Sequence, residues 1–196
     1  MENTGNDLVW YASYGSNLCE DRFLCYIKGG TPKGSVKMHS GCSDKTAPRA
    51  IQNIIINRAL YFAKGYSSWG KGGVAFIKHE PNANEVTLGR MYLISYNQFI
   101  DVVKQENDYE GNLEIDFNEA QVRGSHVFLH NAWYGKLMYL GKESGYPIFT
   151  FTNERFLEEE INAPGSEYLE TLKKGVKESY KITGKELQEY FNKRIK

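Results

Sequence analysis

The chain has 196 residues, with 24 basic side chains (Lys and Arg) against 24 acidic ones and three cysteines. A formal net charge of zero gives no overall field for recruiting nucleic acid or anionic lipid, so it favours a small neutral or zwitterionic ligand. The odd number of cysteines, without a Cys-x-x-Cys pair, indicates neither a disulfide framework nor a zinc site. The length predicts one domain over residues 1–196, because it suffices for one well-buried core and is short for two.

The N-terminal part of the sequence predicts a strand, a turn and a helix. The apolar run at 8–12 is typical of a strand, and residues 18–27 have helical spacing that stops at Gly29-Gly30. Between them lies Tyr14-Gly15-Ser16-Asn17-Leu18. Small and amide-bearing residues after a strand leave backbone N–H groups free, so this turn is a predicted seat for an anionic group.

The next part predicts a long loop and then a β-rich body. Residues 31–53 are rich in Pro, Gly, Ser, Lys and His without periodicity, which is typical of a loop insertion. The β-rich body is expected to contain hairpin-connected, mostly antiparallel strands. The expected strands are residues 54–56, 59–62, 73–77, 86–94, 113–117, 127–129, 133–140 and 148–151.

Helical patterns interrupt and follow these strands. Ser95, with Gln98 three residues later, predicts a capping box for a helix over 96–105, and Glu106 stands at its end. In the tail, a helix is expected at 167–180, and a capping-box pattern at Thr183 predicts a last helix. The chain is therefore expected to belong to the α+β class.

The sequence also bears on location. Residues 1–7 lack the positive n-region and apolar core of a secretory signal, and no run approaches the roughly 18 apolar residues of a membrane span. We therefore expect a cytoplasmic protein.

Several motifs occur together, in order, along most of the chain. The pentapeptide from Tyr14 to Leu18 follows the first strand, Glu106 follows the predicted helix, and Tyr168 lies near the start of a tail helix. With them go Arg58-Ala59-Leu60, Phe62, Ser68-Trp69, Gly72-Gly73-Val74-Ala75, Val86, Gly89, Tyr92, Ala163-Pro164, Gly175 and Lys177-Glu178. In this ordered set the chain resembles the gamma-glutamylcyclotransferase family.

The resemblance implies a small, mixed, mostly antiparallel β-barrel that is partly closed, has flanking helices, and carries a cavity at its mouth. It implies that the α-amino group of a γ-glutamyl amine or γ-glutamyl amino acid attacks its own γ-carbonyl, which forms 5-oxoproline and releases the amine. No cofactor and no metal take part. The implied partner is this small-molecule substrate, with no nucleic acid and no membrane, and the sequence leaves open whether the chain forms a homodimer.

The resemblance also assigns roles to residues. Glu106 matches the catalytic acid/base, Tyr14, Gly15, Ser16, Asn17 and Leu18 match the substrate cradle, and Tyr168 matches a tyrosine of the binding site. These roles are chemically sensible, because one carboxylate can take a proton from the attacking ammonium and return one to the leaving nitrogen. Ring closure is intramolecular, so binding mainly has to fold the glutamyl group, and N–H donors of the turn would stabilise its anionic oxygens.

Other interpretations remain open. Taken alone, a Glu at a helix end is usually solvated, and Gly15 could serve only the turn. Asn107 follows Glu106 where the family usually has Gly, and we expect the turn to survive because Asn tolerates a left-handed conformation. The alternatives are a non-catalytic small-ligand binding or interaction module of the same fold, and an enzyme that forms or cleaves a non-glutamyl amide. The 31–53 segment is expected to cover the cavity or to reshape its specificity.

Overall fold

The structure, a computed structural model, describes residues 8–33 and 37–195. Residues 1–7, where the sequence shows no secretory signal, lie outside the described residues. Residues 34–36 of the predicted loop lie outside them as well. The chain divides into two compact units. The first contains Met1–Ala12, Leu24–Gln52 and Met91–Glu154, and the second contains Ser13–Phe23, Asn53–Arg90 and Arg155–Lys196. A single domain over residues 1–196 stays a prediction.

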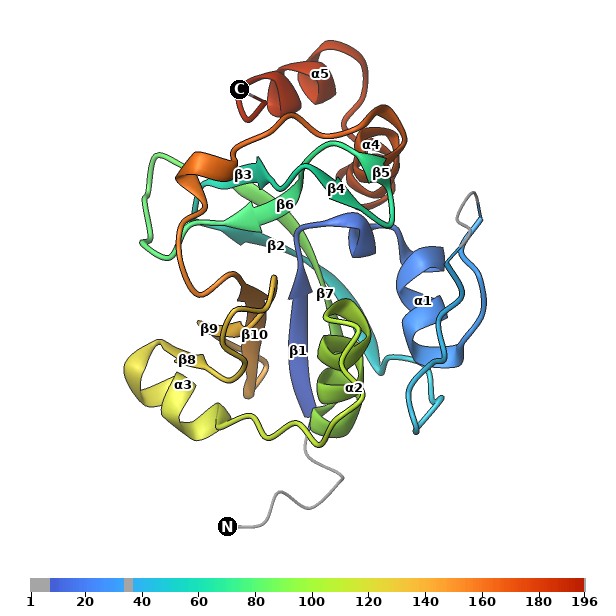
Figure 1. Cartoon of the computed structure of the whole chain (residues 1–196), viewed down its shortest axis with the longest axis vertical. Helices are drawn as coiled ribbons and strands as arrows, with labels where there is room; N and C mark the ends of the chain where they lie inside the picture. Colours follow the sequence, from blue (N-terminus) through green and yellow to red (C-terminus); the bar gives the residue numbers. More distant parts are fainter. Residues whose placement is uncertain (1–7, 34–36, 196) are drawn as a thin grey trace. The chain divides into compact units, whose positions relative to one another are not determined.

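The largest sheet has six strands in the order β2-β7-β1-β10-β9-β8 (Figure 1). These strands are β1 (Leu8–Ser13), β2 (Ala50–Ile56), β7 (Thr87–Ser95), β8 (Ser125–Val127), β9 (Lys136–Glu143) and β10 (Tyr146–Thr152). β1 pairs with β10 in parallel, whereas β10 pairs with β9, and β9 with β8, in antiparallel fashion.

Two small antiparallel sheets complete the β structure. They pair β3 (Leu60–Ala63) with β6 (Val74–Ile77) and β4 (Tyr66–Ser67) with β5 (Gly70–Lys71). The α+β class and the mostly antiparallel pairing are thus confirmed. The barrel implied by the resemblance is not found among the described strands, because β2 and β8 remain the two edges of the six-stranded sheet.

Five helices and two short 3-10 turns accompany the described strands. They are α1 (Glu20–Lys28), α2 (Tyr96–Glu106), α3 (Phe117–Arg123), α4 (Ser166–Tyr180), α5 (Gly184–Asn192), η1 (Ser16–Leu18) and η2 (Glu158–Glu160). None of the described helices combines the length and the apolar character needed to cross a membrane.

An aromatic cluster around Phe99 of α2 forms the core of the first unit. α2 lies along β1 (Figure 1), and the Phe99 ring meets Tyr11 edge-on at 5.7 Å between centroids. Phe117 and Phe151 contact the same ring at 5.5 and 5.9 Å. The predicted capping box is confirmed, because Ser95 Oγ accepts the Gln98 N–H at 3.1 Å and the Gln98 side chain accepts the Ser95 N–H at 3.0 Å.

Three local predictions are wrong. Residues 113–117 do not form a strand: α3 begins at Phe117, because the Asp116 carboxylate accepts the Glu119 N–H at 2.8 Å and caps a helix there. The loop predicted at 31–53 ends earlier, since β2 begins at Ala50. Thr183 does precede α5, but its side chain makes no capping hydrogen bond.

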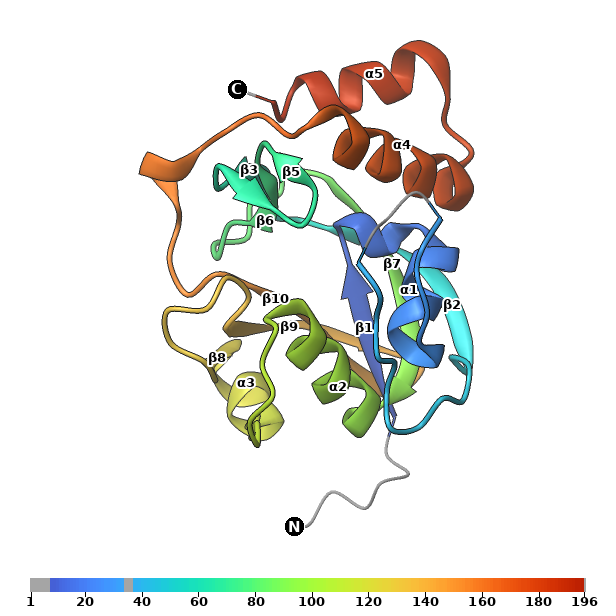
Figure 2. The same ribbon diagram turned by 45° about the vertical axis from the view of Figure 1, so that its right-hand side comes forward.

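In the second unit, the tail helices α4 and α5 lie side by side (Figure 2). The Tyr180 hydroxyl at the end of α4 lies 2.7 Å from the carbonyl oxygens of Ile54 and Gly89. The Tyr190 hydroxyl of α5 accepts the Leu88 N–H at 2.9 Å. Tyr180 therefore attaches α4 to β2 and β7, and Tyr190 attaches α5 to β7.

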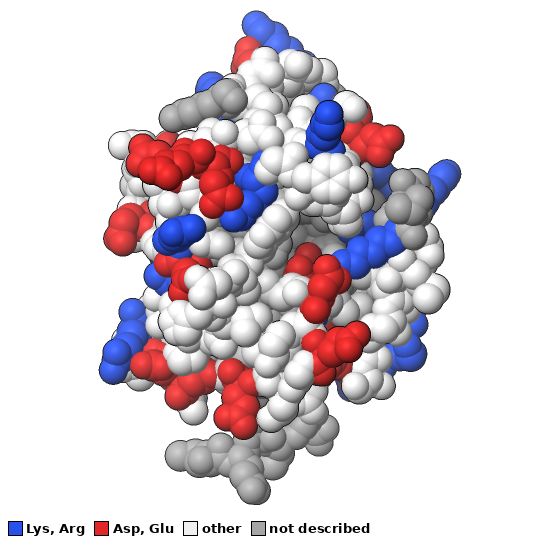
Figure 3. Space-filling view, in the orientation of Figure 1, with Lys and Arg blue, Asp and Glu red and all other residues white. Residues whose placement is uncertain are grey.

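The surface carries both signs of charge. Acidic and basic side chains are interspersed on the face shown in Figure 3. This distribution agrees with their equal numbers in the sequence.

Candidate functional site

The predicted turn forms one turn of 3-10 helix in the second unit. The Leu18 N–H donates to the Gly15 carbonyl at 3.0 Å, and the Cys19 N–H donates to the Ser16 carbonyl at 3.1 Å. The Leu18 N–H, one of the expected donors, is therefore used within the turn. The N–H groups of Gly15 and Ser16 donate to no described residue, so these two remain as donors for a ligand.

The five residues of the pentapeptide also differ in how deeply they are buried. The side chains of Tyr14, Asn17 and Leu18 are buried, while Gly15 and Ser16 are only partly buried. Tyr14, Asn17 and Leu18 therefore build the turn, and Gly15 and Ser16 form the part that a ligand can touch.

The structure brings Tyr168 to this turn. Tyr168 lies in the first turn of α4, is 3% exposed, and accepts the Ala75 N–H with its hydroxyl oxygen at 3.0 Å. A Cβ atom added at Gly15 would lie 3.4 Å from that hydroxyl oxygen. The turn and Tyr168, predicted as parts of one binding site, are thus neighbours within the second unit.

Two glycines, Gly72 and Gly73, allow the chain segment before α4 to pack closely against their own backbone. A Cβ atom at Gly72, where φ is +119°, would lie 2.3 Å from the Gly165 nitrogen, and one at Gly73 would lie 2.2 Å from the Asn162 carbonyl oxygen. Only glycine permits such an approach of two backbones. Gly72 and Gly73 therefore help to position α4 and, with it, Tyr168.

Sequence reasoning did not single out Arg22, which lies beside the turn. Arg22 is 5% exposed, its Nε atom donates to Ser16 Oγ at 3.0 Å, and its guanidinium lies 4.4 Å from the centre of the Trp69 ring. The Trp69 ring in turn contacts the Tyr168 ring at 5.1 Å. A signal was present in the sequence: with Phe23 and with Tyr26 one turn later, Arg22 falls on the buried stripe of its helix.

A second buried arginine lies near the start of α1. Arg90 is 7% exposed, and its Nη1 atom lies 3.7 Å from a Glu20 carboxylate oxygen and 3.6 Å from one of Glu178. Glu20 begins α1 and Glu178 belongs to α4. Arg90 therefore links the two helices that flank the turn within the second unit.

Glu106 belongs to the first unit and is the last residue of α2. Phe99, Val102 and Val103 are fully buried, and Glu106 follows at the i, i+3, i+4, i+7 spacing of one helix face. Glu106 itself is partly buried. It therefore ends the core-facing stripe of α2, not the solvent-facing side where a helix-end Glu is usually found.

Asn107 fixes the end of α2 through its side chain. Its Nδ2 atom donates to the carbonyl oxygens of Val103 at 3.0 Å and Tyr134 at 3.2 Å, and its Oδ1 atom accepts the Tyr134 N–H at 3.0 Å. The expected left-handed conformation is not at Asn107, whose φ is −101°; it is at Asp108, with φ of +48°. Asn107 thus makes a fixed connection between the end of α2 and Tyr134, next to Glu106.

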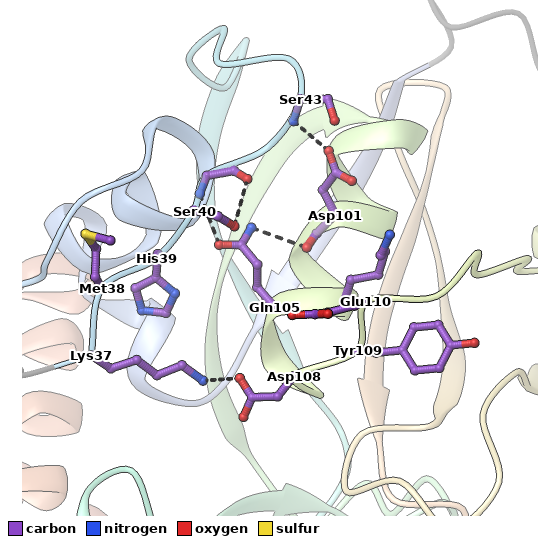
Figure 4. Close-up of a pocket in the computed structure, with 12 residues that line it drawn as sticks. Lys37, Met38, His39, Ser40, Ser43, Asp101, Gln105, Asp108, Tyr109 and Glu110 are labelled. Atoms are coloured by element: carbon purple, nitrogen blue, oxygen red, sulfur yellow. Dashed lines mark hydrogen bonds and ion pairs between the residues drawn. The ribbon is translucent and has the colours of Figure 1, made fainter.

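A polar groove of about 480 Å³ runs along another face of α2 (Figure 4). One wall is formed by residues 37–41 and Ser43, from the predicted loop, and the other contains Asp101, Gln105 and Asp108. Lys37 bridges to Asp108 at 2.6 Å, and Asp101 accepts the Ser43 N–H at 2.8 Å. Glu106 is not among the lining residues. The groove is therefore separate from the stripe that Glu106 ends.

The side chains of the described residues include no group of three or more His, Cys, Asp or Glu placed to hold a metal ion.

Comparison with known proteins gives one relative in sequence. The chain is 34% identical over 205 residues to histone deacetylase 5 of Arabidopsis thaliana, with 95% of the chain covered. The chain spans 31% of the length of that protein. No protein-family model matches the chain.

Two solved structures resemble the chain over nearly its whole length. An uncharacterized protein from Homo sapiens matches with a TM-score of 0.55 and 14% identity, covering 97% of this chain and 89% of that one. A gamma-glutamyl cyclotransferase matches with a TM-score of 0.50 and 13% identity, covering 95% and 99%. At such low identity the likeness concerns the backbone alone. The chain has the fold seen in gamma-glutamyl cyclotransferase.

Proposed function

We propose that this chain cyclises a γ-glutamyl amine or γ-glutamyl amino acid to 5-oxoproline and releases the amine, with Glu106 as general acid/base. The fold, shared with a gamma-glutamyl cyclotransferase, supports this proposal. So does the ordered set of motifs on which the resemblance rests. The proposal includes a cytoplasmic location, a small-molecule substrate, and neither cofactor, nucleic acid nor membrane as a partner.

The position of Glu106 on α2 carries the proposal. An acidic side chain at the end of a stripe of fully buried residues is partly removed from water. This placement suits proton transfer, because a partly desolvated carboxylate exchanges protons with a substrate more readily than a fully hydrated one. The fixed helix end at Asn107 would hold this carboxylate in one place.

In the proposed reaction, Glu106 takes a proton from the α-ammonium group of the substrate. The freed amine attacks the γ-carbonyl carbon, and a C–N bond forms as the carbonyl π electrons move to oxygen. When the tetrahedral intermediate collapses, the bond to the leaving nitrogen breaks and Glu106 returns the proton to that nitrogen. Glu106 then takes the remaining extra proton from the ring nitrogen and passes it to the released amine, which leaves as an ammonium ion. The N–H groups of Gly15 and Ser16 are the proposed donors to the anionic oxygens of the substrate.

The test compares two glutamates close together in the chain. Glu106→Gln should lower the rate of 5-oxoproline release by about 10²- to 10⁴-fold, because the amide cannot shuttle a proton. Glu110→Gln removes the same charge from an exposed position and should leave the rate unchanged. Full turnover by folded Glu106→Gln protein, with 5-oxoproline measured by chromatography, would contradict the proposal.

The two alternatives are outcomes of the same experiment. Calorimetric binding of γ-glutamyl compounds by a wild-type protein that releases no 5-oxoproline would indicate a binding module. Amine release from β-aspartyl or plain acyl amides, without release from γ-glutamyl amides, would indicate another amide-processing enzyme. Because the Arabidopsis relative is named a histone deacetylase, an acetyl-lysine peptide belongs in this panel of amides.

A further inference from the structure

The Ser16 hydroxyl is fixed in one of its two hydrogen-bonding roles. Its oxygen accepts a hydrogen bond from Arg22 Nε at 3.0 Å. A hydroxyl that accepts such a bond keeps its own proton to donate, and Ser16 Oγ donates to no described residue. Ser16 is partly exposed. Its proton is therefore open to a ligand.

Arg22 is held in place by a series of contacts. Its guanidinium lies 4.4 Å from the centre of the Trp69 ring, and that ring meets Tyr168 at 5.1 Å and 61°. Tyr168 is tied to the backbone by the hydrogen bond from the Ala75 N–H. Because each member is at least partly buried, the direction from which Arg22 reaches Ser16 is fixed.

The charge of Arg22 changes what the hydroxyl does. A hydrogen bond donated by an ion polarises its acceptor more strongly than one donated by a neutral group. The hydroxyl proton of Ser16 is repelled by the guanidinium, so it points away from Arg22 and becomes a better donor toward an anion. With the N–H groups of Gly15 and Ser16, the turn offers three donors, which suits a carboxylate.

We propose that Arg22 is a positioning residue, which orients and polarises the Ser16 hydroxyl to bind the α-carboxylate of the substrate. The inference rests on the proposed function, which supplies a γ-glutamyl substrate with that carboxylate. The α-carboxylate carries its charge before, during and after ring closure. Arg22 therefore stabilises the bound substrate and the transition state alike, and its loss raises KM while leaving kcat nearly unchanged.

Steady-state kinetics of 5-oxoproline release test this role. Arg22→Met keeps an unbranched side chain that can pack against Trp69, but it removes the charge and the Nε donor. We expect KM to rise about tenfold and kcat to stay within about twofold. Arg155→Met removes an arginine that is 76% exposed and should change neither constant.

A double-substitution cycle separates positioning from a structural effect. Ser16→Ala should raise KM as Arg22→Met does, and the double variant should be no worse than Ser16→Ala, because Arg22 acts through Ser16. A substrate with an α-carboxamide in place of the α-carboxylate should be nearly insensitive to Arg22→Met. Additive effects on KM, or an equal loss with the carboxamide, would overturn the inference.

Binding of 5-oxoproline, which retains the same carboxylate, separates this inference from the proposed function. If the wild type binds 5-oxoproline without turnover and Arg22→Met binds it more weakly, the proposed function fails and the inference holds. If Glu106→Gln abolishes turnover while Arg22→Met keeps the wild-type KM, the inference fails and the function holds. A wild type that neither binds nor turns over contradicts both.

If circular dichroism shows that Arg22→Met does not fold, the kinetics of Ser16→Ala test the inference instead. The variant is then compared on the substrate with the α-carboxylate and on the one with the α-carboxamide. Loss of the preference for the carboxylate over the carboxamide supports the inference, and an unchanged preference contradicts it.

Discussion

Gly175 of α4 packs directly against Leu18 of the turn: a Cβ atom at position 175 would lie 2.5 Å from the Leu18 Cβ atom and 2.7 Å from the Cys19 nitrogen. The absence of a side chain at Gly175 thus sets how closely α4 approaches the turn. Because Tyr168 lies on the same helix, this contact also helps to place Tyr168 beside Gly15.

Gly175→Ala should destabilise the protein, because the added methyl group meets backbone atoms that cannot move aside. Overpacking of this kind costs about 1–3 kcal/mol in the free energy of unfolding. Urea denaturation provides the measurement. The control is Gly65→Ala, since no atom lies within 4 Å of a Cβ there. Equal stability of the two variants would contradict the close contact.

Asn107→Gly should also destabilise the protein, although glycine is usual at this place in the family that the chain resembles. The substitution removes the side-chain hydrogen bonds to Tyr134 and Val103, at a cost of about 1–3 kcal/mol. It should also lower the rate of 5-oxoproline release, since the preceding Glu106 loses its fixed helix end. Asn112→Gly, at an exposed position, is the control for the glycine itself, and an unaltered Asn107→Gly protein would show that the connection is unimportant.

Tyr168→Phe tests the hydrogen bond that anchors the start of α4. Without its hydroxyl, residue 168 cannot accept the Ala75 N–H, and the free energy of unfolding should fall by about 0.5–1.5 kcal/mol. Tyr66→Phe removes a hydroxyl from a residue that is 70% exposed and should have no measurable effect. Denaturation curves that coincide for the two variants would exclude an anchoring role.

Cys42 should make the protein less stable at alkaline pH. Burial, followed by the negative charge of Asp101, raises the pKa of its thiol from 9.0 to about 12. Above pH 9.0 the unfolded chain therefore loses this proton while the folded chain keeps it. The stabilisation is complete below pH 9.0 and falls by about 1.4 kcal/mol per pH unit until about pH 12.

Cys42→Ala removes this contribution, so its free energy of unfolding should decline less steeply between pH 9 and 11 than that of the wild type. Val122→Ala, at an 86% exposed position without a titratable group, should keep the wild-type slope. Parallel slopes for wild type and Cys42→Ala would refute the assignment.

The resemblance and several elements could be predicted from local sequence patterns. The strand, turn and helix at the N-terminus follow from hydrophobic spacing and from the stop at Gly29. The capping box of α2 needs only Ser95 and Gln98. Such features depend on residues close together in the chain, so their physical basis is visible in the sequence.

The helix α3 shows where local patterns fail. Leu113, Ile115 and Phe117 alternate with polar residues, which favours a strand. The Asp116 cap and the packing of Phe117 against Phe99 stabilise a helix instead. One of these two interactions joins residues 18 positions apart, and a short sequence window does not contain it.

The sequence by itself determined the pentapeptide turn, the position of Glu106 at the end of a capped helix, and the resemblance that joins them. Only the tertiary structure decided that Arg22 holds the Ser16 hydroxyl, that Tyr168 lies beside Gly15, and that Glu106 ends a buried stripe. The physical reason is that backbone conformation is set mainly by neighbouring residues. Burial and hydrogen-bond partners are set by distant segments that meet when the chain folds.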